Sequence, residues 1–367
     1  MTAAEPPSAD GPTPPDPASR RIAELLTGLA PRGGHEIHAV FVLTVAAELA
    51  SVVATDAEGR TVQILPPEEV LALVRRHREA SAAQPGGPWW RYLLLVSASG
   101  EVRTDYDYGD EPFPDDHLFP AEVYRADLEV FPRDRLPVWL AAHIGHADRQ
   151  SRPAETAAGA EPGAAVVEEG LPALPLLVAR WAVLSAAFVA VGSPWGPRVL
   201  PALGLFEGAE HSGSSLWIVP GDRAVLSGGV WNDPVLDAVY NAGAPMPDLY
   251  AGAPIWVANP LLNPRAGIGL LSFCYWWDGG RWFRGASPPA AEVAAAVPAV
   301  WSGENTAAIV AALVEDQPGA RAREAAFGLV LAAERGEIDR AALAEVFGAG
   351  DIEDAHLQLI MAGVASG

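Results

Sequence analysis

The segment FEGAEHSGSS, residues 206–215, holds the side chains best suited to catalysis. Glu207, Glu210 and His211 stand beside a turn rich in glycine and serine. Carboxylates and an imidazole placed around a substrate can exchange protons with it as general acids and bases. The sequence therefore allows a hydrolase-like active site within residues 171–287. Loops of this composition also connect ordinary strands, so a purely structural turn is the competing interpretation.

Two histidine-containing runs have the residue types of metal sites. His143 and His146 are spaced so that both can face one side of a helix. The run Asp115, Asp116 and His117 offers oxygen and imidazole ligands. The histidine pair lacks a carboxylate or cysteine at a matching spacing, and the acidic run lies in a proline-rich loop of the kind that is usually solvated. We predict no bound metal and no cofactor.

The motifs of several large enzyme classes are missing, which argues against those classes without deciding the matter. The chain has no G-x-S-x-G, no H-E-x-x-H, no G-x-G-x-x-G at a strand-to-helix turn and no Walker loop. All 24 basic residues are arginine, which excludes lysine-dependent catalysis. The single cysteine, Cys274, lies in the apolar run LLSFCYWW and is predicted to be a core thiol on a buried strand.

The stretch TDYDYGDEPFPDDHLFP combines acids and aromatic residues in an unusual way. Residues 101–137 contain eleven acids against four arginines. On a strand, Asp105 and Asp107 would share one face, and Tyr106 and Tyr108 would anchor the other face to the core. A solvent-facing edge that resists aggregation would explain the same acids. The alternative is an exposed acidic surface that binds a basic protein partner, formed by Asp105, Asp107, Asp110, Glu111, Asp115 and Asp116.

The overall charge limits the classes of partner. With 46 acids among 367 residues, the formal net charge is −22, and phosphate binding needs a positive surface. Nucleic acid is therefore not expected as the main partner. The first residues lack a basic region followed by an apolar run, so no signal peptide is predicted. The apolar stretch from Leu171 to Gly192 is interrupted by prolines and by Arg180, which favours a core helix over a membrane span. We expect a cytoplasmic protein.

Patterning along the chain predicts an α+β protein with three structured parts. Apolar residues at helical spacing predict a helix at 20–30, and prolines and acids followed by arginines predict another at 66–82. Strand patterns at 38–65 and 89–109 alternate with these helices, which predicts a small antiparallel sheet with helices. A β-rich region with a leading helix follows, and the chain ends in helices. The predicted order is a disordered tail at 1–19, a small α+β domain at 20–146, a linker at 147–170, a β-rich domain at 171–287 and a helical segment at 288–367.

Roughly the first 145 residues resemble the YezG family of immunity proteins. The resemblance lies in the hairpin ending VRTDYDYGDEPF, the helix AEVYRADLEVFPR and the run LPVWL. The matching motif positions are Tyr124, Asp127, Leu128, Phe131, Pro132, Arg133, Trp139 and Leu140. The resemblance implies a non-catalytic protein that neutralises a toxin domain of a bacterial polymorphic toxin system. A toxin nuclease presents a basic cleft, which an acidic inhibitor can reach quickly and block.

Overall fold

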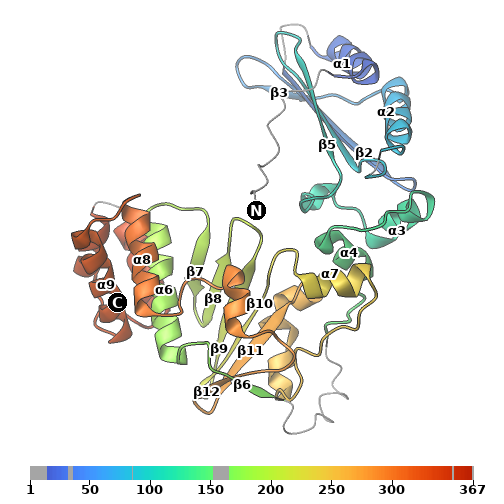
Figure 1. Ribbon diagram of the computed structural model, residues 1–367. Coiled ribbons are helices and arrows are strands. Elements are labelled where there is room, and N and C mark those ends of the chain that lie inside the picture. The colour runs from blue at the N-terminus through green and yellow to red at the C-terminus, as the bar shows by residue number, and fades with distance from the viewer. Residues whose placement is uncertain (1–14, 32–35, 85, 152–164, 349–350, 366–367) are drawn as a thin grey trace, which may run out of the picture. The chain divides into compact units, whose positions relative to one another are not determined.

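The fold is α+β, as predicted, with two antiparallel sheets (Figure 1). The computed structural model describes residues 15–31, 36–84, 86–151, 165–348 and 351–365. The chain divides into two compact units, residues 1–140 and 141–367, and each contains one of the sheets.

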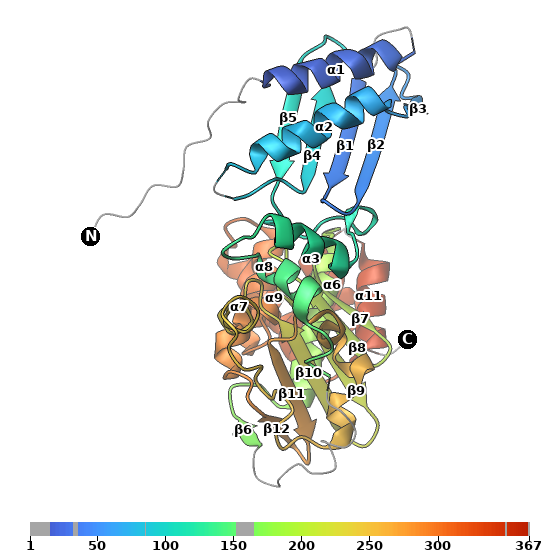
Figure 2. The same ribbon diagram turned by 90° about the vertical axis from the view of Figure 1, so that its right-hand side faces the viewer.

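The first unit is a five-stranded sheet with two helices on one face (Figure 2). The strands follow the order β3-β2-β1-β4-β5, and every neighbouring pair is antiparallel. Helix α3 follows the last strand, and α4 crosses the boundary between the two units in the sequence. The elements are α1 (Pro17–Leu29), β1 (Glu36–Leu43), β2 (Glu48–Thr55), β3 (Thr61–Gln63), α2 (Glu68–Ser81), β4 (Arg91–Val96), β5 (Val102–Asp107), the 3₁₀ turn η1 (Asp115–His117), α3 (Ala121–Val130) and α4 (Val138–Gly145).

Helix α1 begins earlier than the sequence pattern predicts. The predicted tail extends to residue 19, but Asp16 caps a helix that starts at Pro17. The carboxylate of Asp16 accepts the backbone N–H groups of Ala18 and Ser19, which have no partner inside the helix. The stretch PPDPAS thus contains a helix start, and residues 1–14 of the predicted tail lie outside the described residues.

The second unit is built on a seven-stranded antiparallel sheet. The strand order is β6-β12-β11-β10-β9-β8-β7, so the strands from β7 to β12 follow one another as a meander and β6 joins beside the last of them. The strands are β6 (Val166–Glu168), β7 (Gly196–Leu200), β8 (Leu203–Glu207), β9 (Gly213–Val219), β10 (Arg223–Gly229), β11 (Phe273–Asp278) and β12 (Arg281–Arg284).

Helices cover both faces of this sheet. On one face, α6 and the C-terminal helices share a single apolar core with the strands, so the predicted segments 171–287 and 288–367 fold together. The other face is covered by shorter helices, around a core that includes Cys274, which is buried as predicted. The helices are α6 (Leu174–Ala190), α7 (Pro234–Asn241), η2 (Ile255–Ala258), η3 (Pro260–Leu262), η4 (Pro264–Ile268), η5 (Ala290–Ala296), α8 (Gly303–Val314), α9 (Ala320–Glu334), α10 (Arg340–Phe347) and α11 (Ile352–Met361).

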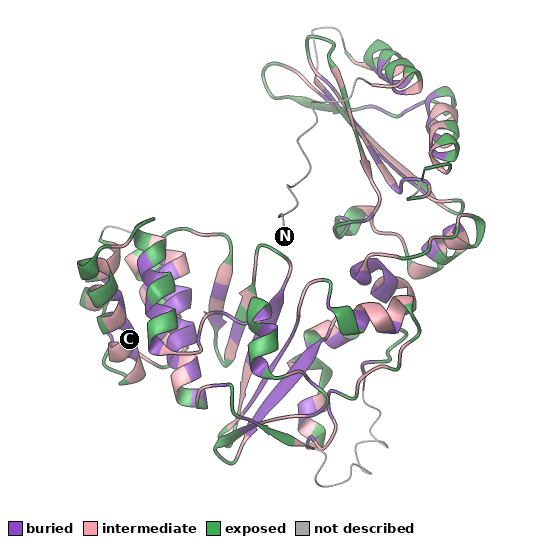
Figure 3. Cartoon of the chain, viewed as in Figure 1, coloured by how far each residue is buried: buried purple, intermediate pink, exposed green. Residues whose placement is uncertain are grey.

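Helix α6 is the central helix of this unit. Twelve of its residues are buried, and Figure 3 shows it among the most buried parts of the chain, together with the central strands. Arg180 points from α6 to Glu334 on α9, with 2.6 Å between Nε and Oε1, and it also donates to two backbone carbonyls. In the part of the chain that the structure describes, no helix has the length and apolar character needed to cross a membrane.

The edge strands of the second sheet are β6 and β7, and each makes a contact with a distant part of the chain. Strand β6 lies inside the predicted linker 147–170, where it pairs with β12 and where Glu168 binds Arg284 at 3.0 Å. Residues 152–164 of that linker lie outside the described residues. At the other edge, Gln358 of α11 accepts the backbone N–H of Val199 on β7 at 2.7 Å. A side chain of the C-terminal helix therefore satisfies a donor that an edge strand would otherwise present to solvent.

Candidate protein-docking surface

Strand β5 separates its tyrosines from its acids, as the alternation predicts. Tyr106 lies opposite Tyr92 of β4, and Asp105 lies opposite Leu93. Tyr92 is fully buried under α1 and α2, so Tyr106 faces the helices, and Tyr106 and Tyr108 both pack against that core. Asp105 is exposed on the opposite side of the sheet. We call this side, which lies opposite α1 and α2, the outer face; it consists of the β1, β2, β4 and β5 side chains that alternate with the buried ones.

On the helix side, Asp16 joins Tyr106 in a polar network. Its Oδ2 accepts hydrogen bonds from Ser19, from Nε2 of His77 at 3.2 Å and from the hydroxyl of Tyr106 at 3.2 Å. The indole N–H of Trp89 can only donate, so Nδ1 of His77 is the acceptor of that 3.1 Å bond and Nε2 carries the proton. The network borders a cavity of about 600 Å³ between α1, α2 and β5.

This network lowers the pKa of Asp16. Partial burial acts to raise it, but the hydrogen bonds from Ser19 and Ala18 and the nearby His77 outweigh that effect and bring the pKa to about 2, from 3.8. Because the folded-state value lies below the unfolded one, the ionised carboxylate stabilises the fold above about pH 4. That contribution disappears as the pH falls from about 4 towards 2.

We expect Asp16→Asn to destabilise the first unit by about 1 kcal/mol at pH 7. Asparagine can still cap α1, but its amide cannot accept the donors that meet Oδ2. The difference from wild type should shrink as the pH is lowered towards 3. Urea unfolding at pH 7, 5 and 3 measures it, and Asp134→Asn, at an exposed position, is the control. A difference that stays the same at all three values would contradict this role of the carboxylate.

The outer face has an apolar centre. Two rows of cross-strand neighbours run over it: Ser51, Val40, Leu93 and Asp105 form one row, and Val53, His38, Leu95 and Arg103 form the other. The apolar side chains in these rows are half-buried, and none of them belongs to the core beneath the helices. A face of this composition combines apolar area with charges at its border, as protein interfaces do.

Asp107 does not belong to the exposed acidic surface, contrary to the prediction. Its carboxylate binds Arg91 with 2.6 Å between Oδ2 and Nη1, and its other oxygen accepts the N–H of Gly109 at 2.8 Å. The Asp107 side chain is only 23% exposed. The alternation on β5 placed Asp107 on the correct face of the sheet, but Arg91 of the neighbouring strand β4 forms an ion pair with its carboxylate.

The remaining predicted acids lie in the loop after β5. Asp110, Glu111, Asp115 and Asp116 are all exposed. Between them, Phe113 is buried and its ring lies 5.6 Å from the guanidinium of Arg91. Arg91 stands on the outer face beside Val42, so Phe113 fixes this acidic loop at one end of that face.

The residues that carry the family resemblance hold the fold together. Asp127 is buried and binds Nη2 of Arg78 at 2.7 Å, the indole N–H of Trp90 at 3.0 Å and the backbone N–H of Val45 at 2.9 Å. Arg133 stacks on the ring of Trp90, 3.4 Å from its centroid. Burial lowers the pKa of Arg133 to about 10, which leaves it charged near neutral pH. These motif positions therefore tie α3 to α2 and to the start of β4.

Trp139 stabilises the turn that follows β5. Its indole N–H donates to the carbonyl of Gly109 at 2.7 Å. Gly109 has φ of +87°, and a Cβ there would lie 3.2 Å from the ring of Trp90, so the turn requires glycine. The run LPVWL thus positions the acidic loop but contributes no side chain to it.

The predicted catalytic residues of the second unit do not form an acid–base site. Glu207 is bound by Arg265, with 2.8 and 2.9 Å between Nη2 and the two carboxylate oxygens. Glu210 is exposed, and His211 packs against Trp231 with 4.8 Å between ring centroids. The three residues line neither the cavity beside α1 and α2 nor the apolar pocket beside α6. The arrangement fits a structural turn between β8 and β9.

The possible metal ligands are not gathered into a site. Within residues 15–31, 36–84, 86–151, 165–348 and 351–365, no group of three or more histidine, cysteine, aspartate or glutamate side chains is placed to hold an ion. Nδ1 of His146 accepts the backbone N–H of Asp148 at 3.2 Å. Nε2 of His117 lies 3.9 Å from the carboxylate of Asp116.

Comparison of the sequence with protein-family models and with curated proteins gives no match.

The apolar centre of the outer face was not predicted from the sequence, although a signal for it exists. In the strands of a sheet with one face exposed to solvent, apolar and polar residues alternate. The runs Ile37–Leu43 and Tyr92–Val96 are apolar at nearly every position, so some apolar side chains must point away from the helices. The three consecutive leucines of β4 place Leu93 and Leu95 on the outer face.

Proposed function

We propose that the first unit is a non-catalytic binding module that holds a basic protein partner on its outer face. The observation that carries this proposal is the combination of half-buried apolar side chains, led by Val40, Leu93 and Leu95, with exposed acids at one border. Burial of the apolar centre would supply affinity. The acids of β5 and the following loop would attract a positively charged surface and orient it.

The partner class that fits best is a toxin domain, with the module acting as its immunity protein. This part rests on the resemblance to the YezG family and on the negative charge of the region. The motif residues Asp127 and Arg133 stabilise the unit, so a shared motif supports a shared fold more directly than a shared partner.

The test uses the full chain and a toxin domain encoded beside its gene. We expect co-expression to relieve the toxicity, and we expect biolayer interferometry to show binding. Leu93→Arg should weaken affinity at least 100-fold, because it removes apolar area and adds a charge that repels a basic partner. No binding by any such toxin domain, or unchanged affinity in Leu93→Arg, would contradict the proposal.

A second variant separates the acids from the apolar centre. Converting Asp110, Glu111, Asp115 and Asp116 to their amides should slow association about tenfold at low salt and flatten its salt dependence, with little change in dissociation. The matched control removes four exposed acids from α1 and α2 on the helix side: Glu24, Glu68, Glu69 and Glu79. Equal slowing in both variants would show that net charge alone, without a defined surface, accounts for the effect.

A further inference from the structure

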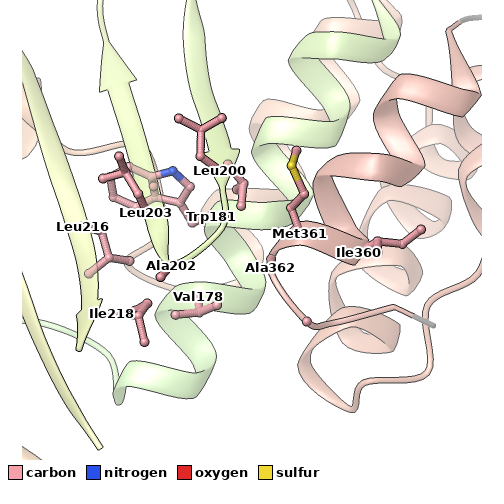
Figure 4. Close-up of a pocket in the computed structure, with 13 residues that line it drawn as sticks. Val178, Trp181, Leu200, Ala202, Leu203, Leu216, Ile218, Ile360, Met361 and Ala362 are labelled. Atoms are coloured by element: carbon pink, nitrogen blue, oxygen red, sulfur yellow. The ribbon is translucent and has the colours of Figure 1, made fainter. Parts of the chain in front are cut away.

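The second unit contains an apolar pocket that the proposed function does not use. It lies between α6, the strands β7 to β9 and the end of α11, and its volume is about 280 Å³ (Figure 4). Val178, Leu200, Leu203, Ile218 and Met361 contribute to its walls, and no charged side chain lines it. Its volume is just below the range of typical small-molecule sites, about 300–1,000 Å³.

Trp181 supplies the polar side-chain group of this pocket. The residue is 1% exposed, and among the described residues its indole Nε1 has no hydrogen-bond partner. Strand β8 lies directly against the ring, since a Cβ on Gly204 would be 2.8 Å from Nε1. Leaving such a donor unpaired is unfavourable, and buried tryptophans normally find an acceptor.

We propose that this pocket binds an uncharged, mainly apolar small molecule that carries one hydrogen-bond acceptor. The apolar body fills the space between α6 and α11, and the acceptor takes the indole N–H of Trp181. A charged ligand is disfavoured because nothing in the lining compensates its loss of hydration. The volume suits about ten non-hydrogen atoms.

Access to the indole nitrogen requires a small rearrangement. Nε1 is covered in the structure, so an acceptor reaches it only when a neighbouring side chain turns aside. Gly204 of β8 lies against the ring, and Leu200, which lines the pocket, is 46% exposed. The proposal therefore implies that the pocket lining in Figure 4 shifts when a ligand binds.

The experiment compares three probes of similar size on the full chain: acetophenone, which has a carbonyl acceptor, cumene, which has none, and benzoate, which is charged. Indole N–H signals are followed by ¹H–¹⁵N NMR, and Trp181→Phe assigns the signal of interest. We expect acetophenone to shift the Trp181 signal in a saturable way and benzoate to leave it unchanged. An unmoved Trp181 signal with acetophenone would overturn the proposal.

Variants separate the acceptor contact from simple filling of a cavity. Trp181→Phe keeps an aromatic ring but removes the donor, so affinity for acetophenone should fall about tenfold while affinity for cumene stays within twofold. Retained cumene binding also shows that the pocket is intact. Equal losses for both probes would refute the role of the N–H.

Filling variants test where the probes bind. Ala362→Phe or Ile218→Phe should abolish binding of both acetophenone and cumene, because each position lines the pocket. Leu205→Phe, at an exposed position of β8 outside the lining, is the matched control and should bind both probes normally. Two filling variants are included so that at least one can be chosen that keeps the native melting temperature. Undiminished binding in such a variant would place the probes elsewhere and overturn the proposal.

Discussion

Asp127→Ala is expected to destabilise the first unit by about 3–5 kcal/mol, because it breaks a buried ion pair. The side chains of Asp127 and Arg78 are 1% and 5% exposed, so removal of the carboxylate leaves a buried guanidinium without its counter-charge. The substitution also leaves the donors of Trp90 and Val45 without their acceptor. The indole N–H of Trp90, which is buried, then lacks an acceptor, and the N–H of Val45 at the protein surface loses its bond.

Urea unfolding, with hydrogen exchange of β1 and β4 followed by mass spectrometry, measures this effect in the first unit. Glu129→Ala, at an exposed position on the same helix, is the control and should cost less than about 0.5 kcal/mol. The double variant Arg78→Met with Asp127→Leu should recover part of the loss, because two apolar side chains leave no unpaired charge. A loss below about 1 kcal/mol in Asp127→Ala would show that water or another group replaces the carboxylate.

Arg180→Ala is expected to cost the second unit about 3 kcal/mol. The guanidinium is largely buried and binds Glu334 together with the carbonyls of Val300 and Trp301. One side chain of α6 thus connects α9 with the segment that precedes α8. Its removal leaves two carbonyls and a carboxylate, 16% exposed, without their donor.

Arg321→Ala provides the comparison, because Arg321 lies on α9 but is exposed. Thermal unfolding should show a clearly lower melting temperature for Arg180→Ala and almost none of that shift for the control. In Arg180→Ala, hydrogen exchange of backbone amides should become faster in α8 and α9, while the amides of the first sheet should exchange as slowly as in wild type. If both variants melt like wild type, the buried ion pair does not hold these helices together.

Local patterns predicted most elements of the fold but not the way distant strands pair. Apolar spacing located α1, the order of prolines, acids and arginines located α2, and the C-terminal segment is helical as predicted. Strand β6 was missed because three residues, Val166–Glu168, carry no periodicity of their own. Their extended form depends on pairing with β12, more than one hundred residues later in the chain.

For the candidate site, the sequence predicted on which side of the sheet each β5 residue lies, but it did not predict which ion pairs form. The alternation of β5 correctly separated Tyr106 from Asp105, because the side-chain period of a strand is a local property. Asp107 was assigned to the same exposed surface, but its partner Arg91 is brought opposite by the register of two strands. The pairing of Glu207 with Arg265 is another contact between segments far apart in sequence.

The meander of the second sheet suggests an order of assembly. From β7 to β12, each strand pairs with the strand that precedes it in the chain, so the sheet can grow strand by strand while the chain leaves the ribosome. The connections are short except between β10 and β11, where α7 and the 3₁₀ turns η2 to η4 are inserted. Strand β6 is the exception, since it is synthesised first and pairs with the strand that is synthesised last. Until β12 has formed, β7 is therefore one edge of the nascent sheet. The most recently formed strand is the other edge, and the next strand pairs with it.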